Sequence, residues 1–102
     1  MPLAPETDRI IVARLMGASW RHAHRQTPTE EAVAELRDIA QGRSDLLAEA
    51  AGLTLGGNEH NEGGWLDRLA APLLVQAGAD PELFEQWIEE GRRRASGPFL
   101  PR

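Results

Sequence analysis

Apolar residues recur every three or four positions over most of this sequence. That spacing places them on one face of a helix, whereas a half-buried strand would alternate apolar and polar residues, and no segment does so. We therefore expect an all-α protein, folded as a compact bundle of about five short helices. The connections are short, which favours antiparallel packing of consecutive helices.

Two of the predicted helices begin at a proline that follows a capping residue. Thr27-Pro28 and Asp80-Pro81 place an N-cap side chain before a proline, whose missing N–H costs nothing at the first helical position. Glu30 lies three residues after Thr27, which is the spacing of a capping box. The second and fifth helices are therefore expected to start at these two points.

The other boundaries are set by apolar periodicity and glycine. The first helix is predicted over 8–24, the third starts at Ser44 and the fourth starts near Trp65. Gly42 and Gly78 are expected to end the second and fourth helices as left-handed caps.

Large side chains on the predicted inner faces define the expected core. Trp20 and Trp87 fall on apolar faces and are interpreted as core anchors, and Leu69 is placed on the inner face of the fourth helix. Trp65 is interpreted either as core or as a contact beside the preceding loop. Pro72 lies inside the fourth helix and should kink it or split it in two.

A chain of 102 residues is expected to form one domain. We divide it into an N-terminal tail over 1–7, a single helical domain over 8–95 and a mobile C-terminal tail over 96–102. The last segment contains two prolines and a glycine and cannot continue a helix.

Composition excludes several classes of protein. The absence of cysteine rules out disulfides, thiolate metal sites and a cysteine nucleophile. There is no apolar run long enough to cross a membrane, and the first residues lack the basic start and apolar stretch of a signal peptide. We therefore expect a cytoplasmic protein, and we predict no cofactor.

The segment over 56–64 is rich in glycine and polar residues and is predicted to be the one long loop. Long loops within compact domains are often functional, so this loop is a candidate ligand or metal site. No metal is assigned, because a metal site needs at least three converging ligands and the loop does not predict convergence. The candidate binding residues here are Asn58, Glu59, His60, Asn61, Glu62 and Trp65.

Two groups of arginines provide another candidate surface. Arg14, Arg21 and Arg25 form a stripe on the first helix, and the run over 92–94 closes the fifth helix. The second group consists of Arg92, Arg93 and Arg94. They could contact nucleic acid, although the formal net charge of −5 disfavours general affinity for a polyanion.

The segment over 46–54 resembles the first helix and turn of helix-turn-helix DNA-binding domains. A recognition helix should follow within a few residues, but glycines follow instead. A second candidate of this type, over 70–90, would place Glu82, Glu85, Glu89 and Glu90 against the phosphates. DNA recognition through either segment is therefore disfavoured.

The stretches 42–52 and 77–95 resemble small helical proteins of actinobacteria and their mobile elements. The resemblance implies a helical fold and a bacterial or phage host. It implies no activity and no site residues.

No catalytic motif is present: there is no nucleophile elbow, zinc-protease motif or phosphate-binding loop. The leading hypothesis is a small non-enzymatic adaptor or regulator of an actinobacterium or its phage, whose partner is another protein. A homodimer is left open, and no membrane partner is expected. The alternatives are a nucleic-acid-binding regulator that uses the arginines and a ligand or metal domain at the 56–65 segment.

Overall fold

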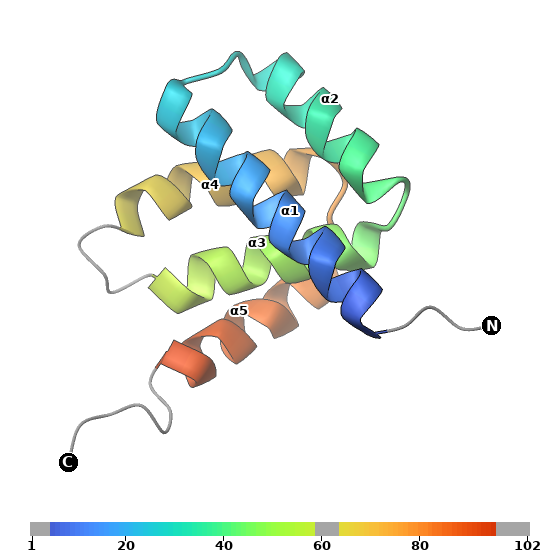
Figure 1. Ribbon diagram of the computed structural model, residues 1–102. Coiled ribbons are helices and arrows are strands. Elements are labelled where there is room, and N and C mark those ends of the chain that lie inside the picture. Colours follow the sequence, from blue (N-terminus) through green and yellow to red (C-terminus); the bar gives the residue numbers. More distant parts are fainter. Residues whose placement is uncertain (1–4, 59–63, 96–102) are drawn as a thin grey trace.

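The computed structural model describes residues 5–58 and 64–95. These residues form helices only, which confirms the predicted all-α bundle (Figure 1). Within the described ranges, none of the helices has the length and the apolar composition of a membrane-spanning segment. The helices are α1 (Pro5–Arg25), α2 (Thr29–Ala40), α3 (Ser44–Asn58), α4 (Gly64–Gln76) and α5 (Pro81–Ala95).

Helix α3 is the centre of the molecule, and every other helix packs against it or against its neighbours. In Figure 1, α5 lies along one side of α3, while α1, α2 and α4 lie on the other. A central helix must be apolar or small on nearly all sides, and α3 has this composition. Its buried residues are Leu46, Leu47, Ala48, Ala50, Ala51, Gly52, Thr54 and Gly56.

The main core lies where α1, α2, α3 and α4 meet. Leu15 of α1, Leu36 of α2 and Leu74 of α4 are fully buried there. A smaller apolar cluster joins Ala23 of α1 to Leu66 and Ala70 of α4. The side of α2 that faces this core carries Ala32, Val33, Leu36 and Ala40, which are all buried.

The predicted loop is wrong over its first residues, because α3 continues through Gly56 and Gly57 to Asn58. The reason is a close crossing of α3 and α5. A Cβ at Gly52 would lie 2.7 Å from the carbonyl carbon of Trp87, and a Cβ at Gly91 would lie 2.9 Å from the amide nitrogen of Gly57. These glycines are present to let two helices approach, which outweighs their low helix propensity.

Two of the predicted core side chains are exposed. Trp20 is 46% exposed and stacks on the ring of His24, and Leu69 is 53% exposed. Both lie at the edges of their helices' apolar faces, where neighbouring elements do not reach them. Trp87 is only half-buried: its Cβ lies against Gly52.

The start of α2 differs from the predicted capping box. Pro28 occupies the N-cap position without a side-chain cap, and the Thr27 hydroxyl lies 2.9 Å from Nδ1 of His22 instead. The start of α5 is as predicted, because Oδ1 of Asp80 accepts hydrogen bonds from the amides of Glu82 and Leu83.

Helix α1 begins at Pro5, three residues before its predicted start, so residues 5–7 belong to the helix and not to the predicted N-terminal tail. The other boundaries lie close to the predicted ones. Helix α4 continues through Pro72 to Gln76 and is not split. Gly78 has a φ of +120° at the end of α4, as predicted for a left-handed position. At the end of α2, Gln41 is left-handed as well as Gly42, and the Gln41 amide donates to the carbonyl of Arg37.

Candidate interaction surfaces

The candidate site in the predicted loop falls mostly outside the described residues. Asn58 is the last residue of α3, and Trp65 lies in the first turn of α4. Glu59, His60, Asn61 and Glu62 lie between the two described ranges. Within those ranges, no group of three or more histidine, aspartate and glutamate side chains could hold a metal ion.

The arginines that close α5 are paired with glutamates of the same helix. Arg92 donates to Glu89 at 2.8 Å, and Nε of Arg94 donates to Glu90 at 2.8 Å. Arg93 also donates to Glu90, with Nε at 2.9 Å. Hydrogen bonds from Arg93 and Arg94 lower the pKa of Glu90 to about 2. The charge of this cluster is therefore largely compensated locally, which weakens it as a binding surface for polyanions.

The guanidinium of Arg94 lies over the ring of Trp87, with Cζ 5.7 Å from the ring centroid. This is the distance of a cation–π contact. The pair borders an open surface hollow of about 370 Å³ that Gln86 and Glu90 complete.

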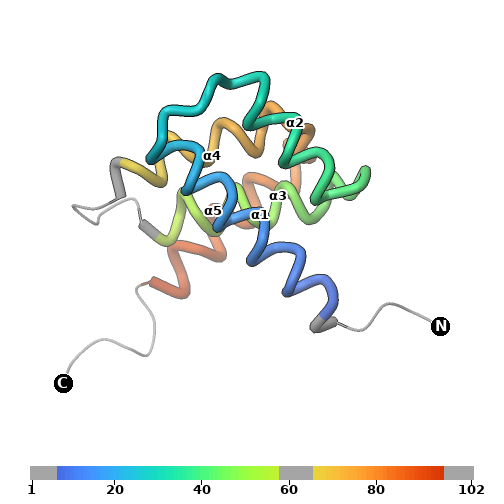
Figure 2. The backbone as a smooth tube through the Cα atoms, turned by 45° about the horizontal axis from the view of Figure 1, so that its top comes forward, coloured from blue at the N-terminus to red at the C-terminus, as the bar shows by residue number. Residues whose placement is uncertain are grey.

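On α1, the arginine stripe is only partly compensated. Arg21 donates to both carboxylate oxygens of Glu35 on α2, at 2.8 and 2.9 Å. Arg14 and Arg25 form no ion pair or hydrogen bond within the described part of the chain. The two arginine groups do not merge into one patch, because the ends of α1 and α5 lie apart, with α3 and α4 between them (Figures 1 and 2).

His22 connects the end of α1 to α2 through a second hydrogen bond to Glu35. The carboxylate can only accept, so Nε2 of His22 carries the hydrogen of this bond, and Nδ1 faces the Thr27 hydroxyl. Glu35 thus holds two side chains of α1 at once, and hydrogen bonds from His22 and Arg21 lower its pKa. The arrangement fixes the α1–α2 turn.

An apolar groove lies between α4 and α5, and sequence reasoning missed it. Both helices pack on α3 but make little contact with each other, which leaves an open volume of about 320 Å³. Val75, 39% exposed, stands at its edge. The signal in the sequence was that Pro72 and Val75 are apolar and lie three residues apart, but the groove itself depends on how α4 and α5 diverge. Its lining consists of Leu55, Arg68, Ala71, Pro72, Val75, Gln76 and Phe84.

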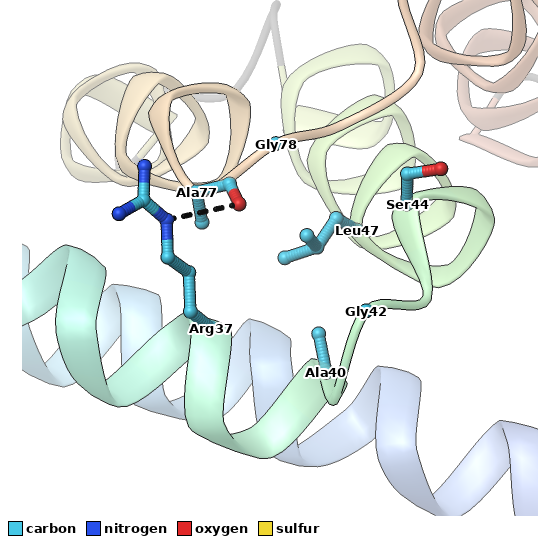
Figure 3. A pocket seen from close by; sticks show the side chains of 7 residues that line it. All are labelled: Arg37, Ala40, Gly42, Ser44, Leu47, Ala77 and Gly78. Carbon is cyan, nitrogen blue, oxygen red and sulfur yellow. Dashed lines mark hydrogen bonds between the residues drawn. The ribbon is translucent and has the colours of Figure 1, made fainter.

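A smaller hollow of about 230 Å³ lies where α2, α3 and α4 meet (Figure 3). Figure 3 shows the side chain of Leu47 pointing into it from α3. Arg37 donates to the carbonyls of Gln76 at 3.3 Å and Ala77 at 3.4 Å. A cation on the last carbonyls of a helix stabilises the helix end, so this hollow is a structural junction.

Comparison of the chain with protein-family models, with curated proteins and with solved structures found no match.

Proposed function

We propose that this chain is a small non-enzymatic interaction module, an adaptor or regulator that binds a partner protein in the groove between α4 and α5. The observation that carries the proposal is the groove itself. Apolar side chains from three helices converge on an open volume of about 320 Å³, and the polar groups of Arg68 and Gln76 stand among them. An exposed apolar concavity bordered by polar groups is typical of a protein-binding surface.

The expected occupant is a short polypeptide segment that presents two or three apolar side chains. The groove is open, and its volume is at the small end of the range for drug-sized ligands. Leu55, Ala71 and Phe84 are among its lining residues and offer contact area to aliphatic or aromatic side chains. Binding would release water from surface that the monomer leaves exposed at Val75.

The test begins with peptides selected from a random display library on the full-length chain. Their affinities are then compared for the wild type, for Val75→Glu and for Ala34→Glu, a matched change at an exposed apolar residue of α2. We expect Val75→Glu to weaken binding at least about tenfold, because it places a charge in the apolar contact. Ala34→Glu should have no effect.

Amide shifts in a titration with the selected peptide should centre on Val75 and Phe84. If the peptides bind Val75→Glu as tightly as the wild type, or if the shifts centre elsewhere, the groove is not the binding surface.

A further inference from the structure

The outward face of α1 carries a second apolar row that nothing in the described chain covers. Ile10, Ala13, Gly17, Trp20 and His24 follow one another at intervals of three, four, three and four, and all five are exposed. This is the spacing of a seam between two packed helices. Ile10 is 60% exposed and Trp20 is 46% exposed, so the row includes large apolar surface.

Gly17, at the middle of this row, has no explanation within the fold. A Cβ built on it would meet nothing within 4 Å, and its φ is not in the left-handed region. Glycine weakens a helix interior, so Gly17 lowers the stability of α1, and no close contact within the fold compensates for this. The buried glycines of the described residues, Gly52, Gly56 and Gly91, face a helix at very close range. Gly17 provides the same kind of close approach, but from outside the molecule.

A row of arginines runs beside this apolar row. Arg14 and Arg21 occupy equivalent positions seven residues apart on the flank of the seam, and Arg25 follows one turn later. Between Arg9 and Arg25 the sequence contains no acidic residue. Arg14 and Arg21 also border a hollow of about 370 Å³ between α1 and α2, adjoining Gly17. The flank is therefore positive on a chain whose formal net charge is −5.

We propose that the outward face of α1 binds an amphipathic helix of a partner protein, which crosses α1 at Gly17 and presents carboxylates to Arg14 and Arg25. Charged residues flanking a helical seam select a partner helix of opposite charge. A second copy of α1 would bring arginines against arginines and is disfavoured. Nucleic acid would use the arginines but requires neither the helical spacing of the apolar row nor a glycine at its centre.

This surface shares no residue with the α4–α5 groove, so the inference goes beyond the proposed function. Together the two surfaces would let one small chain join two partners.

The probe is a displayed library of helical peptides of about 20 residues, long enough to hold helical structure against a partner. Small and aliphatic residues are fixed at the seam positions, and the flanking positions vary among glutamate, lysine and glutamine. Selection on the full-length chain, with counter-selection on Gly17→Leu, should enrich glutamate at the flanks. Arg14→Glu should weaken the selected peptides about tenfold in fluorescence anisotropy.

Ala34→Leu adds a large side chain to an exposed position of α2 and serves as the matched control. It should not change the affinity, and thermal unfolding checks that each variant is folded. Enrichment of lysine or glutamine, or no enrichment over the Gly17→Leu background, would overturn the proposal.

Two further measurements test the other two candidate occupants of this face, a second copy of the chain and nucleic acid. A dimer in light scattering that Gly17→Leu abolishes would show that the face binds a second copy. Binding of a single-stranded oligonucleotide that Arg14→Glu abolishes would assign the face to nucleic acid. Either result would overturn the proposal. A chain that is monomeric in light scattering and does not bind the oligonucleotide agrees with it.

Discussion

Gly56 of α3 faces the main-chain carbonyl of Ile88 of α5 so closely that a Cβ at position 56 would lie 2.9 Å from the carbonyl carbon. Gly52, one turn earlier in α3, faces Trp87 and the amide of Ile88 in the same way. Backbone therefore meets backbone along this crossing, and α5 is attached to the rest of the molecule mainly through it.

Gly56→Ala should destabilise the protein by about 2 kcal/mol. Overpacking typically destabilises a protein by about 1–3 kcal/mol, and the higher helix propensity of alanine offsets about 1 kcal/mol of this. The obstructing atoms belong to the backbone of Ile88 and cannot move without shifting α5, which places the cost at the upper end. Urea unfolding followed by circular dichroism measures the change.

Gly57→Ala is the matched control for this prediction. A Cβ there would meet only the carbonyl oxygen of Gly91, at 4.0 Å, so the variant should be neutral or slightly more stable than the wild type. Equal destabilisation by both variants would mean that helix α3 does not extend through these glycines as described.

Gly17→Ala should stabilise the isolated chain by about 0.5–1 kcal/mol. The position is helical and exposed, and a Cβ would meet nothing within 4 Å. Alanine restricts the unfolded chain and favours the helix, so a rise in Tm of a few degrees is expected. A fall in Tm in differential scanning calorimetry would show that Gly17 has a structural role within the fold.

The glycines show where sequence reasoning succeeded and where it could not. Gly78 stands in a left-handed turn, as its position after an apolar helix predicted. At Gly56 the local signal is low helix propensity, which predicts a loop, whereas the actual role of this glycine depends on Ile88, a residue far away in the sequence. Local patterns predict turns well, but they do not reveal close crossings of distant helices.

The candidate surfaces show the same contrast between features that local sequence patterns predict and features that depend on how distant helices pack. The stripe containing Arg14 was predicted from periodicity alone and lies on one face of α1, as expected. The groove beside Val75 was missed, because it exists only where α4 and α5 diverge from α3. The place of Trp20 on an apolar face predicts a core position, but the helices around α1 leave it exposed.

Asp80→Ala should cost about 1 kcal/mol of stability, within the range for loss of an N-cap. Oδ1 of Asp80 accepts from the amides of Glu82 and Leu83, and both would lose this partner at the start of α5. Asp80→Asn keeps an acceptor oxygen and should retain most of the stability. Chemical denaturation of the two variants separates these outcomes, and equal losses would indicate that the charge of Asp80 matters more than the cap.

Acidification should weaken the contact between α1 and α2 through Glu35. Hydrogen bonds from His22 and Arg21 lower the pKa of this carboxyl from its ordinary value of 4.5. A carboxyl whose pKa is lower in the folded state stabilises the fold above its unfolded pKa. That contribution is lost as the pH falls below about 4.5 through the folded value. Because Glu35 is partly exposed, the contribution should be below about 1 kcal/mol.

Urea midpoints at pH 7 and pH 3 for the wild type and for Glu35→Gln test this prediction. The wild type should lose more stability on acidification than the variant, which has no carboxyl to protonate at this position. Glu31→Gln, one turn earlier on the exposed face of α2, is the control and should lose as much as the wild type. The pKa of Asp45 is also lowered, by Arg43, but this acid sensitivity is common to all three proteins and cancels in the comparison. If Glu35→Gln and the wild type lose the same stability, Glu35 does not stabilise the α1–α2 contact through its charge.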